Sequence, residues 1–574
     1  MFYPKLAVPS EVRKTLQVFQ GLNRGRRIGE GEMQGEENLS SHRYPLLSPR
    51  KSRTTLATGQ HLRGLGWLNG PVYVTGDHIV IHGTTHPLAI GGQDEITILS
   101  MGSYLLFFHL GTFLSPSYIN TADPTDYGLV DNKIGFSTAE VNLTMELCSR
   151  DGTLYTAKPQ EEPPQSPTGG SLWLDNSDGL TLKRWDSGLG VWNPVPETYV
   201  KLSAIGIHNG FSKGDGVTLE GLKLPYGASI QPNCTLVDVG KNFIIVPGIL
   251  PQTTVQTSDV VCVSRVCPQL DFVVEAGNRL WGCRYGPSEE DGSLVNEIYA
   301  CALGDFKNWN KFEGLSTDSY AASRGSQGPW TGAITYLGRP TFFKENCMET
   351  VYPSSNGAHQ ISVTGCRGPV PGSLAVCQEI LYYCTGREVV AYDGSYPKTV
   401  SQALGPISCT KAMAGALGEK LYLALSDGLY VLDTSLGLWH REDSPNICHF
   451  AGDTNTLIFS TKDSIYQVEA GQDPVSWWAE SGDLELSTPE RQFLRRILLR
   501  LRVNLGAWAD VLVSYDDEEQ WHPVGHVEGD GSLTTRQVAI FPRRCDHLRL
   551  RLEGYGPVEV YTLTKIYEKG SDTP

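Results

Sequence analysis

A repeated pair of apolar strands is the feature that most constrains the fold of this chain. Glu379–Gly394, Glu419–Thr434 and Asn455–Gly471 each place an apolar stretch on either side of a turn containing Gly or Asp, which is the short-range pattern of a β-hairpin. Aligned on their leucines, the copies recur after about 40 and then about 36 residues, and such a period is typical of propeller blades. Asn278–Phe312 carries a longer version of the same pattern. We therefore expect an all-β fold built on a β-propeller of about six or seven blades.

The length and composition place further domains around this repeat. A chain of 574 residues predicts two to four domains, and its 62 Gly, 34 Pro and 25 Tyr favour strands with tight turns over helices. The predicted order is an extended N-terminal docking arm (1–55), the first propeller blades (56–159), an inserted small β domain (160–235), the remaining blades (236–478) and a C-terminal β-sandwich (479–574).

The insertion and the sandwich are predicted from changes in the pattern. Glu161–Pro167 is rich in Pro and polar residues, as linkers are, and the strands after it break the blade period; one or two irregular blades are the alternative. Val141–Leu147 is expected in the first blades, and blade hairpins are expected to resume at Asn242–Val246 and Val260–Arg265. Beyond residue 480, strict alternation of apolar and polar residues favours an antiparallel sandwich with one wet face on each sheet.

Basic residues cluster in the arm and on two alternating strands. The arm has ten Lys and Arg against five Glu, and we expect it to lie on a neighbouring subunit, with a flexible terminus as the alternative. The alternating arginines are expected on the polar face of the C-terminal sheet, either as a subunit interface or as a solvated face balanced by carboxylates. The candidate interface residues are Arg24, Arg26, Arg27, Arg50, Lys51, Arg53, Arg496, Arg500, Arg502, Arg549 and Arg551.

The charge and the cysteines limit the class of protein. The formal charge is −16, which argues against wholesale wrapping of nucleic acid. The 13 cysteines are scattered, and no CxxC occurs, so folding in a reducing compartment is expected rather than a secreted disulfide framework. The N-terminus lacks the apolar core of a signal peptide, and the longest apolar run, Tyr104–Phe108, is too short to cross a bilayer. We expect synthesis in the cytoplasm and no membrane insertion.

The sequence predicts no catalytic site, metal site or cofactor. It contains no HExxH, no phosphate-cradling GxxxxGK and no dinucleotide fingerprint. Ser149–Tyr155 and Asn176–Trp185 faintly echo the Asp-box turn of sialidases, which leaves a hydrolase as a minor hypothesis. Glycan binding is a further hypothesis, because exposed indoles stack on sugars, although tryptophans in β domains are mostly core or interface residues. The tryptophans concerned are Trp173, Trp185, Trp192, Trp477, Trp478 and Trp521.

Several stretches resemble virion proteins of tailed bacteriophages, of the propeller-bearing tail-stabilisation or nozzle type. The likeness is carried by Gly21–Arg53, Asn296–Phe312, Asp318–Glu345 and Pro542–Gly554, which together span nearly the whole chain. The resemblance implies a non-enzymatic subunit of a homo-oligomeric ring, six- or twelve-fold, that lies below the portal and extends the DNA channel. It implies portal, adaptor and other tail proteins as partners, and it carries over no site residues.

Two functional hypotheses therefore remain in view. The first is a structural subunit located in the virion tail, for which transient non-specific contact with DNA stays open. The alternative is a receptor- or glycan-binding propeller on a virion or cell surface.

Overall fold

The structure is a computed structural model of the chain. It describes residues 11–58, 61–76, 78–87, 95–109, 117–120, 130–131, 135–137, 142–257, 260–265, 268–288, 292–312, 314–484, 492–516, 518–540, 544–545 and 547–569. Within these ranges every regular element is a β-strand except two 3₁₀ turns, η1 (Ser41–Arg43) and η2 (Gln402–Leu404), so the all-β prediction is confirmed. Neither turn has the length or the apolar run of a membrane-crossing helix.

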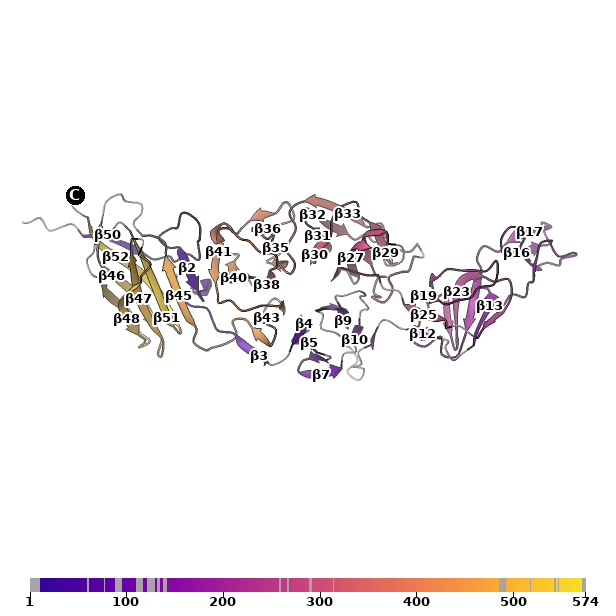
Figure 1. The fold of residues 1–574 in the computed structure, drawn as a ribbon, viewed down its shortest axis with the longest axis horizontal. Coiled ribbons are helices and arrows are strands. Elements are labelled where there is room, and N and C mark those ends of the chain that lie inside the picture. The colour runs from indigo at the N-terminus through magenta and orange to yellow at the C-terminus, as the bar shows by residue number, and fades with distance from the viewer. Residues whose placement is uncertain are drawn as a thin grey trace, which may run out of the picture. The chain divides into compact units, whose positions relative to one another are not determined.

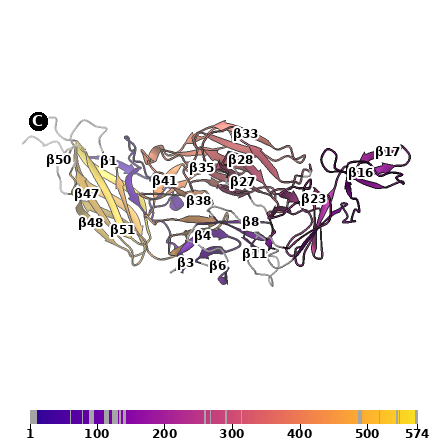
Figure 2. The same ribbon diagram turned by 45° about the vertical axis from the view of Figure 1, so that its right-hand side comes forward.

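The chain divides into two compact units. The first unit comprises residues 1–84, 343–348 and 364–574, and the second comprises residues 85–342 and 349–363. Their elements are labelled in Figure 1, and Figure 2 shows them after a turn of 45°.

Among the described residues, seven four-stranded sheets follow the predicted hairpin repeat. Six of them use four strands that are consecutive in the chain. These are β4 (Leu62–Trp67), β5 (Pro71–Thr75), β6 (His78–Ile81) and β7 (Thr84–Pro87); β8 (Ile96–Met101), β9 (Tyr104–His109), β10 (Ser117–Asn120) and β11 (Val130–Asp131); β26 (Phe272–Glu275), β27 (Leu280–Pro287), β28 (Leu294–Ala300) and β29 (Tyr320–Ser323); β30 (Trp330–Tyr336), β31 (Arg339–Lys344), β32 (Cys347–Tyr352) and β33 (Gln360–Gly365); β34 (Ala375–Cys377), β35 (Ile380–Cys384), β36 (Val389–Tyr392) and β37 (Lys398–Thr399); β38 (Met413–Leu417), β39 (Lys420–Leu425), β40 (Gly428–Asp433) and β41 (Leu438–Arg441).

The seventh sheet is completed by the N-terminal part of the chain. Three of its strands are consecutive, β42 (His449–Gly452), β43 (Leu457–Ser460) and β44 (Ser464–Gln467), and the fourth is β3 (Thr54–Thr58), antiparallel to β44. The hairpins expected within Glu379–Gly394, Glu419–Thr434 and Asn455–Gly471 are all present, since β35 pairs with β36, β39 with β40, and β43 with β44.

Within each unit, successive sheets share buried side chains. In the first unit, Tyr382 of β35 and Leu423 of β39 belong to one apolar cluster, and Ile458 of β43 packs with Leu65 of β4 in another. In the second unit, Trp281 of β27 packs with Phe342 of β31. This face-to-face stacking of sheets in chain order is typical of propellers, and closure into one ring stays a prediction.

The C-terminal part forms a two-layered sandwich. One sheet has the order β1 (Glu11–Leu16), β52 (Val558–Lys569), β46 (Gln492–Val503) and β49 (Leu533–Ala539), with β50 (Arg544–Cys545) also on β46. The other has the order β2 (Met33–Glu37), β45 (Ser476–Ser481), β51 (Leu548–Tyr555), β47 (Trp508–Tyr515) and β48 (His522–Glu528). Both sheets bury their inner side chains in a single core, as the period-two alternation predicted. The sandwich therefore begins before the expected residue 479 and takes one strand per sheet from the arm.

The inserted domain is larger than predicted. Its sheets are β20 (Ser229–Ile230), β23 (Phe243–Ile249), β18 (Tyr199–Ser203), β13 (Leu143–Cys148) and β24 (Thr254–Gln256), with β22 (Asp238–Gly240) on β23; β12 (Gly135–Ser137), β25 (Cys262–Arg265), β19 (Gly216–Glu220) and β21 (Asn233–Thr235); and β14 (Pro159–Gln160), β15 (Leu172–Asp175), β16 (Thr181–Asp186) and β17 (Val191–Pro194). Thus β13, β23 and β25, which were expected in blades, belong to this domain. Their alternating patterns resemble those of blade strands. Only the strands with which they pair, which are distant in the sequence, show that they do not belong to blades.

The arm lies on its own chain. Leu22 is buried in the same cluster as Trp439, whose carbonyl accepts the Leu22 N–H at 2.6 Å. Phe19 and Leu47 enter the sandwich core. The expectation that the arm lies on a neighbouring subunit is therefore wrong for residues 11–55, and residues 1–10 lie outside the described part.

Candidate interaction surfaces

The two most buried arginines of the arm form an internal ion cluster. Arg53 donates to Glu442 at 2.6 Å and also to Asp443, and Arg50 Nε lies 3.3 Å from Glu442 and 2.8 Å from Asn38 Oδ1. The side chains of Arg50, Arg53 and Glu442 are 7%, 11% and 5% exposed. Burial lowers the pKa of Arg50, whereas the two carboxylates outweigh burial and raise the pKa of Arg53. These arginines bind the arm to the end of the sixth blade-like sheet, so they are not available as a subunit interface.

The other basic candidates of the arm are more exposed. Arg24 lies 3.3 Å from Asp427 and donates to the Tyr430 hydroxyl at 2.8 Å. Arg26, Arg27 and Lys51 are exposed. No ion pair joins the side chains of Arg26 and Arg27 to another described residue, so these two remain candidates for a partner.

The outer face of the β1–β52–β46–β49 sheet carries an excess of arginine. Ile497, Leu499 and Leu501 point into the core, so Arg496, Arg500 and Arg502 project outward, as the alternation predicted. We call the outer residues of this sheet and its edge the arginine face. Its charged members with described side chains include Arg13, Arg43, Arg496, Arg500, Arg502, Glu11 and Glu559.

Two carboxylates cannot neutralise the arginine face. Glu11 lies 3.8 Å from Arg13 and 3.4 Å from Arg496. Glu559 lies 3.6 Å from Arg43 and 3.4 Å from Arg502. Arg500 is exposed and forms no ion pair with any residue that the structure describes. The described side chains of this face therefore carry net positive charge, on a chain whose overall charge is −16.

Arg549 and Arg551 lie on the other sheet of the sandwich, which corrects the expectation of one shared polar face. Both project from β51, and the Arg551 guanidinium lies 4.6 Å from the Trp478 ring centre, while that of Arg549 lies 5.5 Å from the Trp521 ring centre. Arg549 also lies 3.1 Å from Glu480, and Arg551 lies 2.9 Å from Glu553. We call this second surface the Arg–Trp face. It agrees with the alternative of a solvated face balanced by carboxylates, because each guanidinium group contacts both a carboxylate and an indole ring.

Three tryptophans gather on one face of the β14–β17 sheet. Trp185 and Trp192 are cross-strand partners with ring centres 5.3 Å apart, and Trp173 lies 5.6 Å from Trp192. The Lys183 ammonium lies 4.7 Å from the Trp173 ring centre. The opposite face packs into the inserted domain through Leu174 and Leu182. We call Trp173, Lys183, Trp185 and Trp192 the tryptophan face.

An ion pair fixes the lysine of the tryptophan face. Asp175 accepts from Lys183 at 2.6 Å and from the Ser177 hydroxyl at 2.6 Å, and these hydrogen bonds lower the pKa of Asp175 to about 2. Because Trp185 and Trp192 remain partly exposed, the face offers aromatic surface beside a fixed charge. Of the other predicted glycan-binding tryptophans, Trp477 is buried in the sandwich core, and Trp478 and Trp521 belong to the Arg–Trp face.

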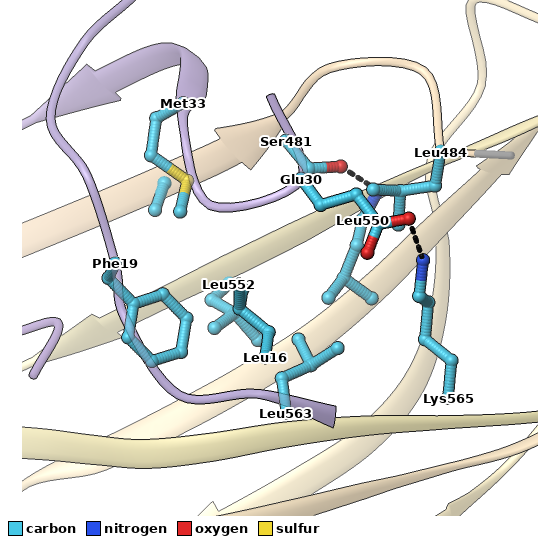
Figure 3. A pocket seen from close by; sticks show the side chains of 11 residues that line it. Leu16, Phe19, Glu30, Met33, Ser481, Leu484, Leu550, Leu552, Leu563 and Lys565 are labelled. Carbon is cyan, nitrogen blue, oxygen red and sulfur yellow. Dashed lines mark hydrogen bonds and ion pairs between the residues drawn. The ribbon is translucent and has the colours of Figure 1, made fainter. Parts of the chain in front are cut away.

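A cavity inside the sandwich is too small for a ligand. Figure 3 shows its lining, with Phe19 and Met33 of the arm opposite leucines of the two sheets. Lys565 pairs with Glu30 at 3.4 Å, and the Ser481 hydroxyl accepts the Leu550 N–H at 3.0 Å. The volume of about 30 Å³ corresponds to roughly one water molecule, so this cavity is a packing defect beneath the arm.

Two motif-like patterns lack the context that their chemistry requires. Gly210–Gly214 fits GxSxG, but Ser212 lies in a turn whose N–H donates to Asp215, not on a strand-to-helix elbow. His78, His82 and His86 stand four residues apart, but His78 and His86 lie on different strands, β6 and β7, and His82 lies in the turn between them, where its ring contacts the Leu68 carbonyl. Among the described residues, no group of three His, Cys, Asp or Glu is arranged to hold a metal ion.

The faint Asp-box echoes are turns stabilised by side chains. The Asp151 carboxylate accepts from the Ser149 hydroxyl and from the Thr153 N–H, and both bonds lower its pKa. In the second copy, Asp175 accepts the N–H of Ser177 at 3.0 Å. Aspartates in such turns stabilise the hairpin whether or not a protein is an enzyme.

Comparison with known proteins gives only distant structural similarity. No family model and no curated protein matches the chain. Similar solved structures include the extracellular domain of a hybrid two-component system of B. thetaiotaomicron (10% identity, 92% of this chain and 100% of that chain, TM-score 0.21). PorZ, a surface component of the type-IX secretion system of Porphyromonas gingivalis, matches at 9% identity over 90% of this chain and 82% of that chain, with a TM-score of 0.25. An exo-β-1,3-galactanase of Phanerochaete chrysosporium matches at 9% identity over 82% and 95%, with a TM-score of 0.16.

These similarities do not assign a fold family or an activity to the chain, because every TM-score quoted is 0.25 or lower. None of the three is a bacteriophage protein. The evidence for a function therefore comes from the arginine face, the tryptophan face and the sequence resemblance.

Proposed function

We propose that this chain is a non-enzymatic structural subunit of a tailed-bacteriophage virion, in which copies form a ring in the tail below the portal. In this proposal the seven blade-like sheets close into one seven-bladed propeller, completed by β3 of the arm. The sequence resemblance supplies the phage setting, with portal and adaptor proteins as further partners.

The arginine face is the observation that carries the proposed self-association. Among its described side chains the arginines outnumber the carboxylates, on a strongly acidic chain. Unlike charges that meet across an interface steer association and fix register, and rings form when two different surfaces of one chain meet head to tail. The acidic remainder of a second copy is the surface that this face fits.

The test is the oligomeric state of the purified full chain. Arg500→Glu combined with Arg502→Glu reverses the charge of the face, and we expect ring assembly, measured by native mass spectrometry, to weaken at least tenfold. Arg387→Glu, at an exposed position on the β35–β36 turn, is the matched control and should leave assembly unchanged. Raising the salt concentration should weaken the wild-type assembly, since exposed charges are screened beyond about 10 Å at 0.1 M.

If the purified protein stays monomeric at all concentrations, even with a portal partner present, the proposal is refuted. Equal loss of assembly in Arg387→Glu would show that total charge, and not the arginine face, controls association.

The second candidate is a receptor- or glycan-binding protein, favoured by the tryptophan face. Partly exposed indoles beside a fixed lysine resemble the stacking surfaces that bind sugars. A glycan array tests it: binding that is lost in Trp185→Ala and Trp192→Ala, but kept in Trp478→Ala, would support this function. The absence of any bound glycan, or indifference to all three substitutions, would eliminate it.

A further inference from the structure

Two cysteines of the first unit lie in direct contact. Cys384, at the end of β35, and Cys409, in the segment before β38, have their sulfur atoms 3.5 Å apart, and both are free thiols. They are 25 residues apart in the chain. Other cysteines, such as Cys283 and Cys301, are buried in separate strands as small apolar side chains.

Gly386 holds the two cysteines in this arrangement. Its N–H points to Cys384 Sγ at 3.4 Å, and its carbonyl accepts the Cys409 N–H at 3.0 Å. A Cβ at this glycine would lie 2.8 Å from the Cys409 carbonyl oxygen, and its φ of 84° disfavours any other residue. Ser373 fixes Cys384 from the other side, since its hydroxyl accepts the Cys384 N–H at 3.2 Å.

The two thiols differ in their access to solvent. Cys384 is buried, whereas Cys409 is partly exposed and lines a cleft of about 870 Å³. Lys411, Lys462 and Asp463 line the same cleft, so lysines outnumber carboxylates in its lining. A cleft of this size admits a small peptide disulfide, and the excess of lysine favours an anionic one.

We propose that Cys409 and Cys384 form a redox-active pair, in which Cys409 reacts first with an anionic low-molecular-weight disulfide such as glutathione disulfide and Cys384 then resolves the product. This arrangement, an accessible thiol beside a buried one, is that of a sensor cysteine and its resolving partner. Burial raises the pKa of Cys384, which is consistent with Cys409 being the first to react, because the thiolate is the nucleophile.

The reaction balances without any further reagent. The Cys409 thiolate attacks one sulfur of glutathione disulfide, which forms the mixed disulfide and releases one glutathione thiolate. Cys384 sulfur then attacks Cys409 sulfur, and its proton passes to the second glutathione that leaves. The protein loses two protons and two electrons, and these convert one glutathione disulfide into two glutathione molecules.

The inference is independent of the proposed function. The product would join the fifth blade-like sheet to the segment that leads into the sixth, closing a loop of about 26 residues. It would stabilise these sheets when the protein moves from a reducing to an oxidising environment.

The test uses the full chain, reduced and then incubated with glutathione disulfide. Peptide mass spectrometry should find the Cys384–Cys409 cross-link, reversible by a thiol, and the Tm should rise by about 5 °C. Cys384→Ser should stop at the glutathione adduct of Cys409, and Gly386→Ala should form the cross-link at least tenfold more slowly. Cys448→Ser, which alters another cysteine of the cleft, should react as the wild type does.

Three results would overturn the inference. They are a stable glutathione adduct of Cys409 in the wild type, a cross-link to another cysteine, and no reaction of Cys409 while the protein remains folded. The wild-type measurement alone decides among them, so the conclusion does not depend on whether a variant folds.

Discussion

Removing Glu442 should release the arm, because this carboxylate bridges two buried arginines. It lies 2.6 Å from Arg53 and 3.3 Å from Arg50, with 5% of its side chain exposed. Breaking a buried ion pair on one side costs about 3–5 kcal/mol, since the remaining charge is left buried. Asp443 still serves Arg53 and Asn38 still serves Arg50, so Glu442→Ala should fall at the lower end, at about 3 kcal/mol.

Amide hydrogen exchange measures this loss where it occurs. The Asn38 N–H donates to the Arg441 carbonyl and the Arg50 N–H donates to Asn38, both at 2.9 Å, so both amides report on detachment of the arm. A loss of 3 kcal/mol should speed their exchange by roughly two orders of magnitude. Arg13→Ala is the control, because Arg13 is 63% exposed and exposed pairs contribute at most about 1 kcal/mol. If both variants slow or speed exchange equally, the internal ion cluster does not hold the arm.

Two further predictions concern the blade-like sheets and the sandwich. Burial of the Glu469 carboxyl raises its pKa, but the ion pair with Lys420 outweighs this effect and holds the pKa below its ordinary value of 4.5. As the pH falls, the Glu469 carboxylate is therefore protonated in the unfolded chain before it is protonated in the folded protein, and stability is lost as the pH falls below 4.5. Lys420→Met should flatten that acid loss between about pH 5 and 3 in urea titrations, and an unchanged profile would contradict the assignment. Leu563→Ala should enlarge the cavity of Figure 3 and cost about 3 kcal/mol in urea unfolding, whereas a loss below 1 kcal/mol would show that the cavity collapses.

Local patterns predicted the elements of this fold well. The hairpins β35–β36 and β39–β40 follow from turn residues and apolar strands that lie within about 16 residues of each other. The outward direction of Arg496, Arg500 and Arg502 follows from the two-residue period of a strand. Both kinds of prediction need only the residues of one hairpin or one strand.

Predictions that depended on a distant partner failed. The patterns of β13 and β23 are those of half-buried strands, and nothing within them distinguishes a blade from the inserted sandwich. Arg551 alternates in the same way as Arg502, yet β51 and β46 belong to different sheets. A period of two determines which residues share a face of one strand, but strand pairing determines which strands share a sheet.

The arm shows why its charges could not be interpreted from the sequence. Its strands β1, β2 and β3 join β52, β45 and β44, and its arginines pair with Glu442 and Asp443, about 390 residues away. A basic segment with apolar anchors has the same composition whether its acidic partners lie on another subunit or on the far end of its own chain. Only the pairing distinguishes the two, and here the arm completes two sandwich sheets and one blade-like sheet. Because β1 pairs with β52, the last strand that the structure describes, the arm can reach its final position only after that strand has been made.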